Sequence, residues 1–363
     1  MRRILILLIT ISLLTISSSI AGAQESASPE LTFQQAVDMA KASSKTLKNA
    51  NYDIDQSKKV RDKVADNVTF TPAGGDENKT ANDRFYSLVQ ADLNLAINKR
   101  TLSQQEDTVI MQVYQLYDGV LQAQEKVGLA ELQLKNAERQ RAVTEANVRV
   151  GILSKSALIQ ADAAVEAAKS GSSGLETLKK SLDDAYQKFN QLVGLNQNDR
   201  PVLNYSPSFN EFKVDDLDTA VNRAIDASPS VWTAEQQIEL AKLSLEQYNF
   251  NSESSTYDAQ AINVSKAEVA ADTVRNNLDK TLRTLYYSIK QLEVQYASAQ
   301  ESEKSAEETL RVTKVKFDAG MAIEPDVIAA EVALAQAKQS LKDIAYQHEI
   351  KVYAFNKPWA SST

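Results

Sequence analysis

"VRVGILSKSALIQADAAVEAA", at positions 148–168, is the most informative stretch of the sequence, because its pattern occurs a second time later in the chain. The second copy, "FDAGMAIEPDVIAAEVALAQA" at 317–337, lies 169 residues further on, with its glycine at the same place and alanines in step behind it. Glycine lets the backbone reverse, and alanine is the strongest helix former. We therefore predict that each copy is a tight turn leading into a helix, and that the chain is internally duplicated.

Apolar residues before and after each turn alternate at spacings of four and three, which is typical of a coiled-coil seam. The outgoing arms carry Val109, Val113, Leu116 and Val120, and 169 residues later Leu278, Leu282, Leu285 and Ile289. The returning arms carry Leu158, Ala161 and Val165 through to Phe189, and Val327, Ala330 and Leu334 through to Phe355. Each unit is thus predicted as a long helix, a turn and a long helix back, with an outgoing arm of roughly 75 Å for about 50 residues.

The N-terminal parts of the two halves also match each other, but at a different offset. "AVDMAKASSKTLKNANYDIDQSKK", from Ala36, corresponds to "AVNRAIDASPSVWTAEQQIELAKL", from Ala220, a shift of 184. We expect short helices at 31–65 and 215–249, ahead of long hairpins at about 98–193 and 267–357. The larger shift places about fifteen extra residues in or near 67–98, a turn-rich and β-leaning segment. These boundaries give a first repeat over 24–207, with that reduced β segment, and a second repeat over 208–363.

The first 23 residues have the layout of a secretory signal: Arg2 and Arg3, an apolar run from Ile4, and the small residues Ala21-Gly22-Ala23. We expect this signal peptide to be cleaved and the protein to be exported; an uncleaved membrane anchor is the alternative. The chain has no cysteine, so it offers no disulfide, thiolate metal site or lipid-bearing cysteine.

Composition argues against nucleic-acid binding and against catalysis. The net charge is −8, without a cluster of Lys and Arg that would suit a phosphate backbone. The only histidine, His348, falls on a seam position, where an imidazole is usually structural or solvated. The sequence has no phosphate-binding glycine loop, metal-spaced carboxylates or nucleophile elbow. We therefore expect no enzyme activity, no cofactor and no metal.

Three stretches together resemble a known family. They are "LTFQQAVDMAKASSKTL" (31–47), "RVGILSKSALIQADAAV" (149–165) and "AYQKFNQLVGL" (185–195), and all three recur as a degenerate second copy. In order, spacing and duplication they resemble the outer-membrane efflux protein family, the TolC-like channel proteins. The resemblance implies an elongated all-α protomer of two helical hairpins, three of which close into an α-helical tunnel. It also implies hairpin tips that dock on a periplasmic adaptor, which connects the tunnel to an inner-membrane pump.

The resemblance assigns two groups of residues at the turns. By position, the adaptor-binding tips are Val150, Gly151, Ile152 and Leu153 in the first copy and Ala319, Gly320 and Met321 in the second. The alternative is that these residues only hold the turns. Family members also close the tip with acidic side chains that face the pore, and the candidates here are Asp318, Glu324 and Asp326. The alternative for these three is a solvated surface.

The chain departs from the family where members insert membrane-spanning β-strands into each half. The first half offers at most a stunted β-hairpin around Gly74 and Gly75, and the second half has no strand pattern. Two functions stay open: an efflux or export component of the cell envelope, or a non-transporting extracytoplasmic scaffold that binds a partner through its tips. We expect a homotrimer, because second faces of the arms carry apolar residues, namely Tyr114, Leu121, Leu132, Tyr287 and Val294.

Overall fold

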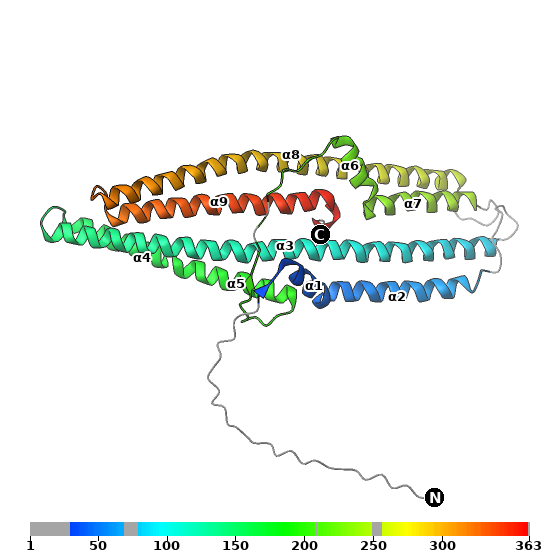
Figure 1. Ribbon diagram of the computed structural model, residues 1–363. Helices are drawn as coiled ribbons and strands as arrows, with labels where there is room; N and C mark the ends of the chain where they lie inside the picture. Colours follow the sequence, from blue (N-terminus) through cyan, green and yellow to red (C-terminus); the bar gives the residue numbers. More distant parts are fainter. Residues whose placement is uncertain (1–29, 69–78, 206, 208, 249–255, 362–363) are drawn as a thin grey trace, which may run out of the picture.

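The computed structural model describes residues 30–68, 79–205, 207, 209–248 and 256–361, and shows an elongated bundle of helices (Figure 1). Its longest helix, α3 (Lys79–Arg149), runs almost the full length of the molecule. Helices α2 (Lys45–Ala65), α4 (Lys155–Ser170) and α5 (Leu175–Val193) lie along one side of α3. Helices α7 (Pro229–Glu246), α8 (Tyr257–Asp318) and α9 (Glu324–Asn356) lie along the other. The predicted all-α class is confirmed.

The remaining elements are short. Helix α1 (Phe33–Ser43) precedes α2, and helix α6 (Leu217–Asp226) precedes α7. Thr32 caps α1 in a capping box with Gln35, and Asp216 caps α6 by accepting the Thr219 amide hydrogen. Strands β1 (Glu30–Leu31) and β2 (Val202–Leu203) form a two-stranded parallel pair, with Glu30 opposite Val202. The chain ends in a 3₁₀ helix, η2 (Pro358–Ser361).

The predicted coiled-coil seams are buried where the arms meet. Val113 and Val120 of α3, and Leu282 and Ile289 of α8, are fully inaccessible. Around them lie two apolar clusters, the first mostly from the first half of the chain together with Tyr346 of α9, and the second from the second half. The first joins α1, α3 and α5, and the second joins α6, α8 and the end of α9. The heptad spacing therefore packs each outgoing arm against the returning arm of its own hairpin.

The expected β character of the 67–98 segment is wrong over 79–98, because this stretch is part of α3. Its alternating apolar residues favoured a strand, but packing on α2 overrides that local preference. Leu93 is buried, Asp92 pairs with Arg61 of α2 at 2.7 Å, and the Asn98 side chain donates to the Asp53 carbonyl at 3.2 Å. The first outgoing arm therefore begins at residue 79 rather than 98, and the second begins at 257 rather than 267. Gly74 and Gly75 lie outside the described residues.

The returning arm of the first hairpin is broken, whereas the sequence predicted one continuous helix. Helix α4 ends at "SGSSG" (170–174), and α5 starts beyond it. A Cβ atom on Gly171 would lie 2.5 Å from the Ala167 carbonyl oxygen, so this turn accepts no side chain. The positions 169 residues later hold Ser340 and Asp343, and α9 continues through them without a break.

The second face of α3 is covered by the other half of the same chain. Tyr114 packs on Tyr353 of α9, with ring centroids 5.3 Å apart, and Leu121 is buried. This corrects the argument that both residues need a neighbouring protomer. Of the second-face residues, Tyr287 and Val294 of α8 are strongly exposed, at 63% and 72%.

The C-terminal segment is fastened to α3 through Asp107, whose side chain is only 13% exposed. The Trp359 indole N–H donates to Asp107 Oδ2 at 2.7 Å, and the Lys357 ammonium lies 3.3 Å from the same oxygen. The Tyr353 hydroxyl donates to the Asp107 carbonyl oxygen at 3.2 Å. One carboxylate in the first half thus holds the end of the second half.

We expect Trp359→Phe to lower the free energy of unfolding by about 1.5–3 kcal/mol, the usual worth of a hydrogen bond to a charged group. The ring and its packing are kept, so the loss reports the indole N–H alone. Urea unfolding followed by far-UV circular dichroism measures it. Trp232→Phe is the matched control, because the Trp232 ring lies under the Arg100 guanidinium and keeps a cation–π partner as phenylalanine. Equal losses for the two variants would show that Asp107 does not fasten the C-terminus.

Candidate functional site: the two hairpin tips

Both hairpins turn at the same end of the molecule, at the left of Figure 1. Each turn is a Schellman motif, with a glycine in the left-handed region just after the helix. In the first, the Ile152 amide donates to the Asn147 carbonyl at 2.8 Å, and Gly151 has φ 82°. In the second, the Met321 amide donates to the Lys316 carbonyl at 2.8 Å, and Gly320 has φ 70°. The recurring glycine is therefore explained by a backbone conformation that L-residues rarely adopt.

The apolar residues after these glycines do not pack against their own hairpins. Ile152 is 71% exposed and Met321 is 73% exposed. In a Schellman motif an apolar residue at this position often contacts the residue five or six places earlier. The residues five places earlier are Asn147 and Lys316, and Val315, six places before Met321, is itself exposed. The exposed side chains therefore do not staple the turns.

The apolar surface of the tips is wider than the sequence prediction. The exposed large apolar residues at the first tip include Val150, Ile152 and Leu153, all predicted. At the second tip, Phe317 and Ile323 are exposed beside Met321, and neither was singled out from the sequence. Contiguous exposed apolar side chains of this kind are typical of interaction surfaces. Their position on either side of the turn is the signal that could have found them.

The three predicted acidic residues have different surroundings. Glu324 pairs with Arg139 of α3, with its Oε1 atom 3.2 Å from Arg139 Nε, and so links the second hairpin to the first. Asp326 accepts the Ile323 amide hydrogen at 3.0 Å and caps α9. Asp318 is exposed at the end of α8 and makes no ion pair in the part of the chain that the structure describes. Arg139 was not predicted, since nothing local in the sequence marks a pairing between residues 139 and 324.

His348 is buried in the second half. It is 3% exposed, its Nε2 atom lies 3.5 Å from Glu293 Oε1, and its ring packs on Phe209. Glu293 also accepts the Phe212 amide hydrogen at 2.7 Å and pairs with Lys290. Despite burial, these hydrogen bonds lower the pKa of Glu293, so it stays an anion that holds the inter-repeat linker. The structural interpretation of His348 fits this position.

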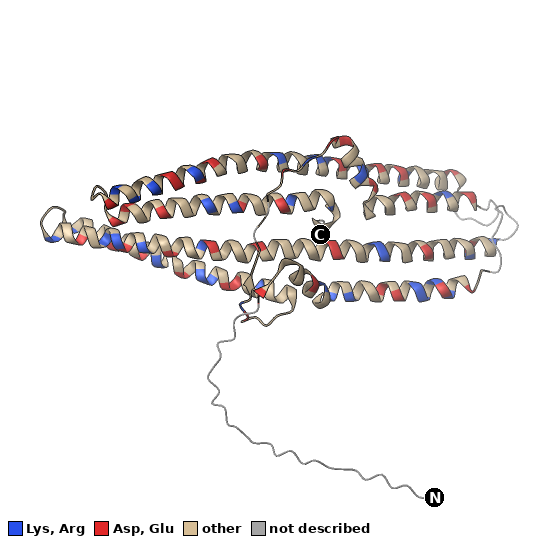
Figure 2. Ribbon diagram, in the orientation of Figure 1, with Lys and Arg blue, Asp and Glu red and all other residues tan. Residues whose placement is uncertain are grey.

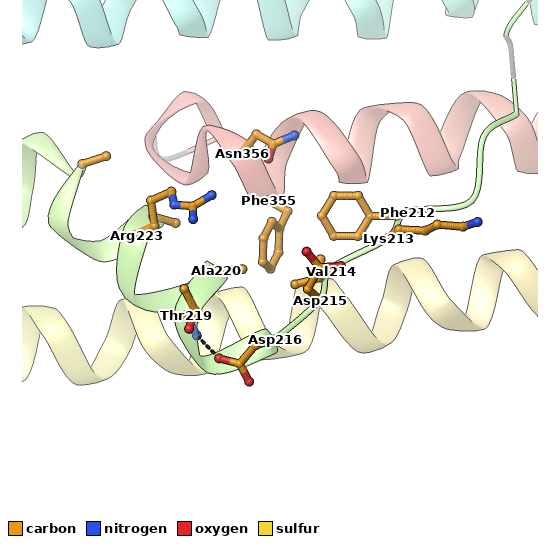
Figure 3. Close-up of a pocket in the computed structure, with 12 residues that line it drawn as sticks. Phe212, Lys213, Val214, Asp215, Asp216, Thr219, Ala220, Arg223, Phe355 and Asn356 are labelled. Carbon is orange, nitrogen blue, oxygen red and sulfur yellow. Dashed lines mark hydrogen bonds between the residues drawn. The ribbon is translucent and has the colours of Figure 1, made fainter.

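A cavity of about 450 Å³ opens nearby, between the linker, α6 and the end of α9 (Figure 3). Phe212 and Phe355 form one wall, and Arg223 and Asp216 carry charge at its edge. Asp216 is occupied as the helix cap, and its hydrogen bonds to Thr219 lower its pKa. Among the described residues, no three His, Asp or Glu side chains are grouped as metal ligands. The same part of the chain contains no helix that is both long and apolar enough to cross a bilayer.

Comparison with known proteins agrees with this architecture. Residues 219–356 match the family model for outer membrane efflux protein. No curated protein matches the chain. Among solved structures, the chain is similar to CusC, described as a protein that folds into a transmembrane channel, with 14% identity, TM-score 0.66, and coverage of 91% of this chain and 92% of that one.

Two further structures have the same fold. The Campylobacter jejuni CmeC outer membrane channel is 14% identical, with TM-score 0.62 and coverage of 97% and 93% of the two chains. The Vibrio cholerae outer membrane protein VceC is 12% identical, with TM-score 0.62 and coverage of 89% and 96%. Identities this low show the fold alone. The chain thus has a TolC-like fold, and its residues 219–356 match the outer membrane efflux protein family.

Proposed function

We propose that the chain is the tunnel component of an efflux or export system of the cell envelope. Three copies enclose the tunnel, and their six hairpin tips dock on a periplasmic-type adaptor that joins the tunnel to an inner-membrane pump. The observation that carries the proposal is the pair of tips, which lie at one end and expose Ile152 and Met321 to solvent. A tip that had only to turn would not need large apolar side chains in water.

Self-assembly is supported by the edges of the protomer. One edge is formed by α8 and the opposite edge by α2, α4 and α5 (Figure 1). Helix α8 has an exposed apolar stripe at helical spacing, formed by Ile262, Val269, Tyr287, Val294 and Val315. If the α8 edge of one copy packs on the opposite edge of the next, the contact is heterologous, and a rotation of one third of a turn between copies closes it into a ring of three. The family resemblance sets the number of copies at three.

The location follows from the same reasoning. The solved relatives CmeC and VceC are described as outer membrane proteins. We place this chain in the cell envelope, exported by a signal over 1–23, which lies outside the described residues. The two repeats, 24–207 and 208–363, each supply one hairpin to the tunnel wall.

At the tunnel end, Asp318, Glu324 and Asp326 form part of the aperture in this proposal. A ring of carboxylates there favours cations. Asp318 is the member best able to face the lumen, because Glu324 is paired with Arg139 and Asp326 caps α9. The alternative function, a scaffold that only binds a partner through its tips, needs no ring and no lumen.

The ring makes a prediction about the α8 stripe. Sedimentation at micromolar concentration should show a trimer for the native chain and a monomer for Tyr287→Glu/Val294→Glu, because each glutamate would bury an unpaired charge at the contact. Gln300→Glu is the control, since it adds one charge to an exposed position on another face of α8. A native monomer, or a trimer that survives the double change, would count against the tunnel.

The tips make a second prediction. Gly151→Val/Gly320→Val should weaken binding of a periplasmic-type adaptor that the native chain binds by at least tenfold, because a left-handed backbone costs an L-residue roughly 1–2 kcal/mol. Helical content should stay nearly unchanged by circular dichroism. Surface plasmon resonance with the purified adaptor measures the binding.

The control for the tips is Gly119→Ala/Gly128→Ala, which changes two glycines within α3 that also have open space around them. Alanine in a helix is more stable than glycine, so this variant should bind as the native chain does. Undiminished adaptor binding by the valine variant would mean that the tips are only turns.

A further inference from the structure

The interface between the two halves contains a buried carboxyl group that no other part of the account uses. Asp118, in the middle of α3, is 1% exposed. Neither of its carboxyl oxygens has a hydrogen-bond partner in the part of the chain that the structure describes. None of the ion pairs in that part includes it either. An ionised carboxylate in such a place would lose its hydration without compensation.

Asp118 belongs to a second seam of α3, which runs beside the apolar one and faces α9. Its members are spaced by four, three, four and seven residues: Asp107, Met111, Tyr114, Asp118 and Glu125. Asp107 pairs with Lys357, and Glu125 pairs with Lys342 of α9 at 2.6 Å. Asp118, between them, has no cation.

The groups that face Asp118 are acidic or phenolic on every element around it. Helix α9 contributes Glu349 and Tyr346, the linker contributes Tyr205, and α3 itself contributes Tyr114 and Tyr117. The Tyr205 hydroxyl donates to Glu349 Oε2, and the Tyr117 hydroxyl donates to the Leu31 carbonyl oxygen at 2.7 Å. His348, next to Glu349 in sequence, is directed at Glu293 of α8. The cluster thus contains two carboxyl groups and four phenols.

This environment favours the neutral acid at Asp118. Burial, with a smaller contribution from the charge of Glu349, raises the pKa of Asp118 from 3.8 to about 8. Burial also raises the pKa of Glu349, and it raises that of Tyr114 to about 12, so the phenols stay neutral.

We propose that the two halves of the chain are joined by a proton-dependent latch. Asp118 enters the α3–α9 interface as the neutral carboxylic acid, and its ionisation beside Glu349 loosens the packing of α9 on α3. The latch lies within one chain, so it stands whether or not the trimer forms. Because each half carries its own hairpin, loosening here changes how the two tips are held relative to each other.

The sign of the pH dependence follows from proton linkage. Between about pH 4 and pH 8 the folded chain keeps a proton at Asp118 that the unfolded chain has lost. Stability therefore falls as the pH rises through this window, by up to about tenfold in the folding equilibrium constant per pH unit. Above the folded pKa the two states bind equally few protons, and the dependence ends.

The test is urea unfolding of the full chain at fixed protein concentration from pH 5 to pH 9.5, for the native chain and Asp118→Asn. The folding equilibrium constant of the native chain, divided by that of Asp118→Asn, should fall steadily up to about pH 8 and then level off. Asp272→Asn, at an exposed position on α8, is the matched control and should give a constant ratio over the same range. A constant ratio for Asp118→Asn would overturn the proposal.

Two measurements cover the case in which Asp118→Asn does not fold. The infrared spectrum of the native chain at pH 6.5 should contain a protonated-carboxyl band that disappears by pH 9.5, and a spectrum without this band would refute the neutral acid. The chain has no cysteine, so spin labels can also be placed on Gln115→Cys of α3 and Gln347→Cys of α9. The distribution of distances between the labels should broaden over the same pH rise, and an unchanged distribution would refute the loosening.

Discussion

Helix α3 has to bury two faces along much of its length, and the rest of the structure is arranged around that requirement. One face carries the apolar seam, with Val113 and Val120 packed toward the returning arm of its own hairpin. The other carries Met111, Tyr114 and Asp118 and packs against α9 and the C-terminal segment. Most of the stability of a helix in a folded protein comes from the packing of its apolar faces, and α3 offers such faces over 71 residues. Through its two seams, α3 packs against both the first and the second half of the chain.

The two seams differ in chemistry, and this difference gives them different roles. The apolar seam is non-directional and tolerates the alanines that let helices approach closely. The second seam is specific, because Asp107 and Glu125 each find a cation on α9 or just beyond it. Polar contacts fix the register of the halves along α3, whereas the apolar contacts supply most of the buried surface. The position of the two tips at one end depends on that register.

Charge is distributed in a way that agrees with this division. In Figure 2 the acidic and basic residues of α3 and α8 are interspersed along both helices. At the second tip, the exposed charge of Asp318 stands beside the exposed apolar side chains of Phe317 and Met321. Arg141 of α3 pairs with Asp162 of α4, and Lys314 of α8 pairs with Glu331 of α9, so each hairpin has ion pairs near its own tip. These pairs are exposed and contribute little stability individually. They link the outgoing and returning arms of each hairpin beside its tip.

Much of the fold could be predicted from the sequence. The heptad spacing indicates which residues of each helix face a partner helix, and the repeated glycine indicates where the chain turns back. The seams, the turns and the all-α class depended on nothing else. The helical state of 86–98 could not be read, because it is decided by packing on α2, and neither could the break at Gly171, where two glycines outweigh the seam. At the tips, the positions came from the resemblance, whereas the exposure of Phe317 and the pairing of Glu324 with Arg139 needed the three-dimensional structure. Asp118 was missed because a single aspartate in a helix reads as a solvated charge unless the spacing of the second seam is followed.

Copies of this protomer are proposed to enclose a passage, with the hairpin tips gathered at one end. Electron microscopy of the purified full-length protein would make such a passage visible. We expect hollow particles with three-fold symmetry, about as long as α3, which at 1.5 Å per residue is roughly 105 Å. Solid rods, or single protomers without a lumen, would contradict it.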